Sequence, residues 1–92
     1  MNSKPYELPG KLMTLSMFEL RPNYNYAFTL EELRCVHYLI CDYSINEVAE
    51  IFGLSQEATY KMRERTIKKA NMQCFEGLVG WLFTHGIFVV KM

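Results

Sequence analysis

The sequence predicts one all-α domain of four helices that follows an N-terminal arm. Three helix-capping patterns, apolar residues at helical spacing and the confinement of all three prolines to the first 27 residues support this prediction. Half of the 92 residues are apolar, which is enough for one hydrophobic core and too much for intrinsic disorder. We place the arm, whose structure we leave open, at residues 1–27 and the domain at residues 28–92.

Capping residues predict where the first three helices begin. Thr29 and Glu32 have the spacing of a capping box, in which a hydroxyl and a carboxylate each accept a backbone N–H of the other residue. Ser44 and Glu47 repeat this spacing, and Ser55 offers a third N-cap. We therefore expect helices from residue 29 to a turn at 42–43, from 44 to 53, from 55 to about 70, and from about 75 to 84.

The second and third of these helices have the pattern of a helix-turn-helix. Small Ala49 lies where the two helices approach each other, and Gly53 lies at the turn, where a left-handed conformation is needed. In such a pair the second helix can enter the major groove of DNA. Thr59 would fill the space between the helices less well than an aliphatic residue. The other residues expected there are Val48, Phe52, Leu54 and Met62.

Charge is unevenly distributed in this chain, although its net charge is zero. Residues 29–57 contain six acidic residues and one basic residue, whereas residues 58–72 contain five basic residues and one acidic residue. The positive charge therefore falls on the third predicted helix, where it could attract phosphates. The alternative is that these basic residues stabilise the C-terminal end of their own helix and stay in solvent.

Short motifs follow one another in a fixed order along residues 28–88. They are Phe28-Thr29-x-x-Glu32, Ser44-x-x-Glu47-Val48-Ala49-x-x-Phe52-Gly53-Leu54-Ser55, Arg63-x-Arg65, Lys69, Leu78-Val79 and His85-Gly86. In this order, and without a gap, they resemble the four-helix DNA-binding domain of LuxR-type, or GerE-type, bacterial transcription regulators. The resemblance implies that the third helix reads the major groove and that the fourth helix mediates dimerisation on an inverted repeat.

The resemblance also implies which residues contact DNA. The groove-facing positions of the family fall on Tyr60, Lys61 and Glu64. The positions that contact the DNA backbone fall on or near Ser55, Ala58, Arg63, Arg65 and Lys69, and we add Lys68 because of its charge.

The chain departs from the family pattern at the start of the third helix. Residues 58–60 are Ala-Thr-Tyr where the family has Thr-Val-Lys, so a hydroxyl, a core aliphatic side chain and a basic contact are missing, although Lys61 could replace the charge. Thr66 and Ala70 stand where the family prefers Ile and Leu. Glu57 and Glu64 would repel DNA phosphates, although a carboxylate such as that of Glu64 can also accept a hydrogen bond from cytosine.

The fourth predicted helix is more apolar than one buried face requires. Its core stripe consists of Phe75, Leu78, Val79 and Leu82, and Trp81 and Phe83 lie on either side of it. One possibility is that Leu12, Leu15, Met17 and Phe18 of the arm cover this surface. The other is a homodimer in which Gly77 and Gly80 allow close approach and the interface contains Phe75, Leu78, Trp81 and Phe83.

Metal binding and catalysis are not indicated. Cys35 and His37 would point about 200° apart on a helix, so they cannot share an ion with Cys41, and buried thiols are the better explanation. Cys74 and His85 add no known spacing, and the sequence contains no phosphate loop or nucleophile motif. We therefore expect neither an enzyme nor a bound metal or cofactor. The longest uncharged stretch, residues 77–90, is too short and too rich in glycine to span a membrane.

Two functions follow as hypotheses. The first is a cytoplasmic, stand-alone transcription regulator that binds double-stranded DNA as a dimer. The second is a degenerate helix-turn-helix module that pairs with another regulator or with RNA polymerase and changes its activity.

Overall fold

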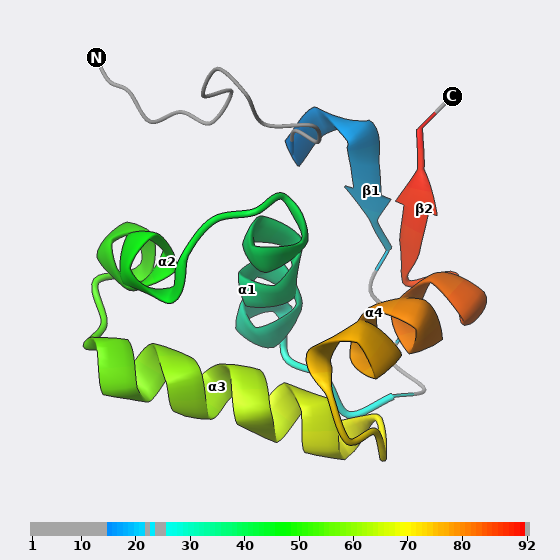
Figure 1. Cartoon of the computed structure of the whole chain (residues 1–92). Coiled ribbons are helices and arrows are strands. Elements are labelled where there is room, and N and C mark those ends of the chain that lie inside the picture. The colour runs from blue at the N-terminus through cyan, green and yellow to red at the C-terminus, as the bar shows by residue number, and fades with distance from the viewer. Residues whose placement is uncertain (1–14, 22, 24–25, 92) are drawn as a thin grey trace.

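A computed structural model of the chain describes residues 15–91 except 22, 24 and 25 (Figure 1). Within these residues it contains four α-helices, α1 (Leu30–Ile40), α2 (Ile45–Phe52), α3 (Gln56–Lys69) and α4 (Phe75–Thr84). A 3₁₀ turn at Leu15–Met17 leads into strand β1 (Phe18–Leu20), and strand β2 (Phe88–Val90) follows α4. The fold is compact and mostly helical, as predicted, but the strands form a small sheet that the all-α prediction missed.

The predicted caps begin the first three helices. The Thr29 hydroxyl accepts the Glu32 N–H at 3.1 Å, and the Glu32 carboxylate accepts the Thr29 N–H at 2.9 Å. Ser44 and Glu47 form the same pair of bonds at 3.1 and 2.9 Å. The Ser55 hydroxyl accepts the Ala58 N–H at 3.0 Å. Both capping boxes and the third N-cap are therefore confirmed.

The turn between α2 and α3 depends on Gly53. Its φ of 70° is in the left-handed region that glycine adopts without strain. Val48 and Met62 are buried between the two helices as predicted, and Phe52 is half-buried. Leu54 is 40% exposed, so its predicted place in this core is wrong. Its backbone N–H instead closes the turn by donating to the Ala49 carbonyl at 2.9 Å.

Two threonines of α3 have their side chains in the hydrophobic core. Thr59 and Thr66 are fully buried, which would be costly for an unpaired hydroxyl. Each hydroxyl donates to the carbonyl four residues earlier, Thr59 to Ser55 at 2.9 Å and Thr66 to Met62 at 2.7 Å. The polar residues that departed from the family pattern are therefore satisfied within their own helix.

The sheet joins the two ends of the described chain, which lie side by side in Figure 1. Strands β1 and β2 are antiparallel, with Glu19 opposite Val89 at the centre. Backbone bonds extend the pairing on both sides, from Arg21 N–H to the Ile87 carbonyl at 2.7 Å and from Lys91 N–H to the Met17 carbonyl at 2.9 Å. Residues of the predicted arm and of the predicted domain thus share one sheet.

Aromatic residues that precede α1 cover the apolar surface of α4. The Phe18 ring lies edge-on to Phe83 with 5.4 Å between centroids, and Tyr26 and Phe28 lie edge-on to Trp81 at 5.1 and 5.5 Å. Phe18 and Tyr26 of the arm therefore cover part of α4, as one of the two alternatives predicted. Phe18 of the predicted set is confirmed, whereas Met17 is exposed, and Leu12 and the side chain of Leu15 lie outside the described residues.

The described helices are all shorter or less apolar than a membrane-crossing helix must be.

Candidate nucleic-acid interface

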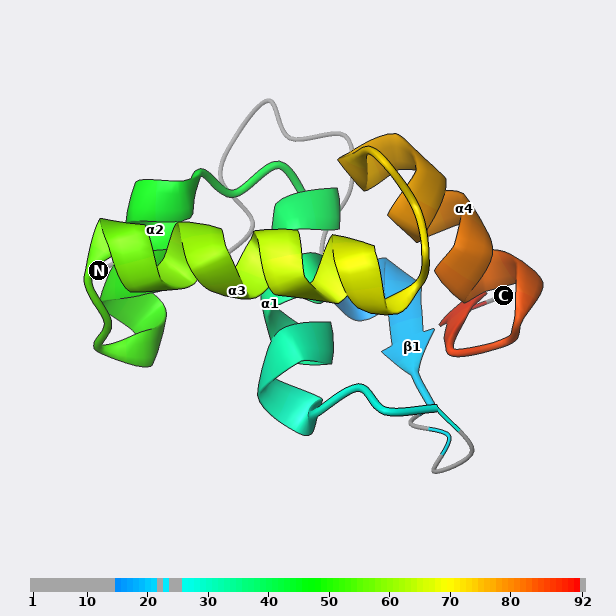
Figure 2. The same ribbon diagram turned by 90° about the horizontal axis from the view of Figure 1, so that it is seen from below.

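Helix α3 lies on the outside of the molecule, below α1 and α2 in Figure 1. Seen from below, it passes in front of both helices (Figure 2). Thr59, Met62, Thr66 and Ile67 form its buried face. The outward face, exposed or half-buried, consists of Glu57, Tyr60, Lys61, Glu64, Arg65 and Lys68.

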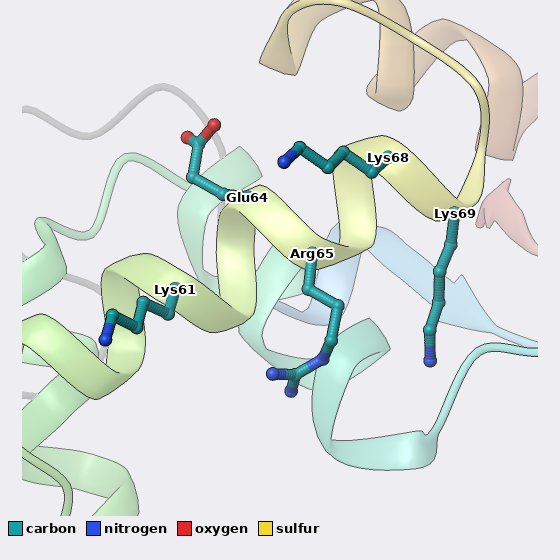
Figure 3. Close-up of a pocket in the computed structure, with 5 residues that line it drawn as sticks. All are labelled: Lys61, Glu64, Arg65, Lys68 and Lys69. Carbon is teal, nitrogen blue, oxygen red and sulfur yellow. The ribbon is translucent and has the colours of Figure 1, made fainter.

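Four basic side chains and one acidic side chain line a shallow hollow on α3 (Figure 3). Lys61 and Lys68 both extend toward the N-terminal end of α3. Arg65 and Lys69 point down toward the beginning of α1, whereas Glu64 points away from them. The structure thus brings the predicted basic residues 61, 65, 68 and 69 together on one side of the molecule.

A buried carboxylate from α1 lies behind this surface. Glu32 is 1% exposed and accepts hydrogen bonds from Arg65 Nε at 2.7 Å and from Lys69 Nζ at 2.9 Å. Burial alone would raise the pKa of Glu32. The bonds from Arg65, Lys69 and the Thr29 backbone outweigh burial and hold this pKa below 4.5, its ordinary value.

This pKa shift predicts how the domain responds to acid. Because the pKa is lower in the folded state, the stabilisation by ionised Glu32 is complete above the unfolded value of 4.5 and is lost as the pH falls through the folded value. We expect Glu32→Gln to lower the free energy of unfolding at neutral pH by about 1–3 kcal/mol, since two charge-assisted hydrogen bonds weaken. Urea unfolding across a pH series should also show a smaller acid-induced loss in the variant. An equal loss in both proteins would exclude Glu32 as its source.

The ammonium group of Lys69 makes two hydrogen bonds within the protein. Besides its bond to Glu32, its ammonium group donates to the Ala27 carbonyl at 2.8 Å, and its side chain is 29% exposed. Two of its three donors are therefore occupied by protein oxygens. The predicted contact between Lys69 and the DNA backbone gains little support, because DNA would have to displace these two hydrogen bonds.

Arg63 also has internal partners. It is half-buried, pairs with Glu64, and lies over the rings of Phe75 at 5.0 Å and Tyr60 at 5.8 Å. These contacts place it on the side of α3 that faces α4 and balance its charge. The predicted DNA contact at Arg63 is therefore not supported by the geometry. The ion pair between Arg63 and Glu64 also offsets the repulsion expected between Glu64 and DNA.

The remaining predicted DNA contacts are accessible. Ser55, Ala58 and Tyr60 are exposed, although the Ser55 hydroxyl is already engaged as the N-cap. Lys61 is 3.5 Å from Glu57 in an exposed ion pair, a type of contact that contributes little energy. The ammonium group of Lys68 has no hydrogen-bond or ion-pair partner among the described residues.

The predicted dimer residues on α4 differ in their surroundings. Leu78 is completely buried in the core of the single chain, so it has no surface to offer to a partner. Trp81 and Phe83 are half-buried beneath the residues that precede α1. Phe75 is half-buried and lines a small apolar hollow between α1 and α4, together with Leu39, Ile40, Glu76 and Val79.

The cysteines and histidines, all of which lie in the described residues, are not grouped as a metal centre. Cys35 and Cys41 are buried, as predicted, and burial raises the pKa of the Cys35 thiol to about 11, so it stays protonated at neutral pH. Cys74, in contrast, is exposed. The His37 ring packs against Phe18 and Phe88. In the described part of the chain, no three His, Cys, Asp or Glu side chains are grouped as metal ligands would be.

Comparisons of the chain with protein-family models, with curated proteins and with solved structures find no match. The fold and the site define a small, mostly helical protein in which a short turn joins α2 to α3 and α3 presents an exposed surface with basic side chains.

Proposed function

We propose that the chain is a sequence-specific, DNA-binding transcription regulator of the LuxR or GerE type. The observation that carries this proposal is the uncovered outward face of α3, on which Lys61, Arg65 and Lys68 reach solvent. A helix in this position can enter a major groove while its basic side chains reach phosphates on the groove walls. The ungapped series of motifs from residue 28 to residue 88 supports the same class of protein.

In this proposal the residues of α3 divide into two groups. Tyr60, Lys61 and Glu64 face the base edges. Arg65 and Lys68 contact phosphates, and Ser55 and Ala58 lie where the sugar-phosphate backbone passes the start of the helix. Arg63 and Lys69 instead stabilise the fold, which revises the roles that the resemblance assigns to them.

The proposal includes a homodimer in the cytoplasm that binds an inverted repeat through two copies of α3. The surface of α4 that remains for such a dimer surrounds the hollow lined by Phe75 and Val79. Gly80 supports this arrangement, because a Cβ atom built there meets no atom within 4 Å and the helix surface is therefore open. Leu78 is no part of this interface.

A second candidate function is a protein-interaction module that binds another regulator or RNA polymerase. It is favoured by Glu57 and Glu64, which alternate with Lys61 and Lys68 on the outward face of α3. Alternating charges suit a protein partner better than a polyanion.

The two functions can be separated by selecting duplexes from a random pool with the purified protein. The first function predicts that a recurrent sequence emerges and binds at least about 100-fold more tightly than its scrambled version at physiological salt. Equal, weak binding of both duplexes that disappears as salt is raised would contradict it and favour the second function.

A further inference from the structure

Glu32 lies behind the basic surface of α3 and contacts two of its basic residues. We propose that Glu32 is a positioning residue for DNA binding, whose buried carboxylate holds Arg65 so that the two terminal nitrogens of the guanidinium group face one phosphate. This inference rests on the proposed function, and it identifies which cation of the site is oriented before DNA arrives.

The geometry of Arg65 leaves one edge of its guanidinium group available. Its Nε donates to Glu32 Oε2 at 2.7 Å, while the side chain is 54% exposed. The two terminal nitrogens have no hydrogen-bond acceptor among the described residues. A guanidinium group is planar, so a fixed Nε also restricts the direction of the opposite edge. That edge matches two oxygens of a single phosphate.

Glu32 is suited to this role because it is itself held in place. Its Oε1 accepts from the Thr29 N–H and from Lys69 Nζ, both at 2.9 Å, and the carboxylate is shielded from solvent. The carboxylate and its two cationic partners carry a net charge of one positive unit. The cluster therefore still attracts phosphate although it contains an acidic residue.

The inference is tested by a double-mutant cycle on the duplex obtained by selection. The four proteins are the wild type, Glu32→Gln, Arg65→Ala and the double variant, and circular dichroism verifies that each is folded. We expect each single substitution to lower affinity by about tenfold, the scale of one lost charge-assisted bond. The double variant should bind no more weakly than Arg65→Ala. Additive losses would overturn the inference, because they would show that Glu32 acts independently of Arg65.

A charge-conserving substitution keeps the inference testable if Glu32→Gln does not fold. Arg65→Lys retains the positive charge but lacks the fork that can bind Glu32 and a phosphate at once, so we expect affinity to fall by about fivefold or more. Arg21→Lys is the matched control, because this exposed arginine pairs with Glu19 beside the sheet and has no part in the proposed site, so the affinity should change by less than about twofold. Unchanged affinity of Arg65→Lys would overturn the inference.

Lys68→Ala distinguishes failure of this inference from failure of the proposed function. Weaker binding by Lys68→Ala, combined with additive effects at Glu32 and Arg65, would reject the positioning role and retain DNA binding by α3. If the wild type does not bind the duplex, or if Lys68→Ala binds it as tightly as the wild type does, the proposed function fails as well.

Discussion

Replacement of Phe88 by alanine is expected to lower the free energy of unfolding by about 3–5 kcal/mol, the range observed when a buried phenylalanine is truncated. Phe88 is 1% exposed and belongs to the core cluster formed by α1, α3, α4 and the C-terminal segment. Its ring packs against His37 and Phe83, with centroid distances of 5.6 and 5.9 Å. Urea unfolding followed by circular dichroism measures the loss.

The matched control lies two residues further along the same strand. Val90 is 50% exposed, so Val90→Ala should cost less than about 1 kcal/mol. Similar small losses in both variants would show that β2 is not packed on the helices, and the described fold would then be wrong at its C-terminal end.

Reversal of two charges on α3 is expected to have the largest effect on DNA binding. The double variant Lys61→Glu/Lys68→Glu should bind duplex DNA at least about 100-fold more weakly than the wild type at 0.1 M salt, because two cations that face DNA in the proposed complex become anions. Both side chains reach solvent on the outward face of α3, so the fold should not change. Fluorescence anisotropy with a labelled duplex measures the affinity.

A second double variant controls for the change in net charge. Arg21→Glu/Lys91→Glu alters the charge equally on exposed residues beside the sheet, which lies far from α3 in Figure 1. Its affinity should change by less than about fivefold at this ionic strength, since screening weakens distant charges. Equal losses in the two double variants would indicate a general charge effect without a binding face on α3.

The helices could be predicted from sequence because their signals are local. Thr29, Ser44 and Ser55 begin the helices that they were expected to cap, and Gly53 ends α2 in the left-handed conformation. Each of these signals depends on atoms within four residues of one another, so spacing alone reveals it.

Features that depend on contacts between distant segments could not be predicted in this way. Strand β1 pairs with residues about seventy positions away, and three-residue strands leave too short an alternation to recognise. The contact between Glu32 and Arg65 spans 33 residues. The capping box explained Glu32 fully at the level of sequence, so nothing indicated a second role for its carboxylate in the candidate site.

Leu54 shows a second limit of prediction from sequence, which concerns the burial of a side chain. Its position after the glycine of the turn matches an apolar position of the family pattern, yet the side chain faces solvent. Spacing relates a residue to a turn, but only the three-dimensional packing of α2 on α3 decides which side chain fills the space between them.

Binding of duplex DNA by the outward face of α3 is tested by titrating isotope-labelled protein with the selected duplex while its amide NMR shifts are recorded. We expect the largest shifts on residues 55–69 and smaller ones at the start of α1 near Glu32. Shifts that are confined to α4 or to the acidic residues of α1 and α2, or no shifts at all, would contradict it.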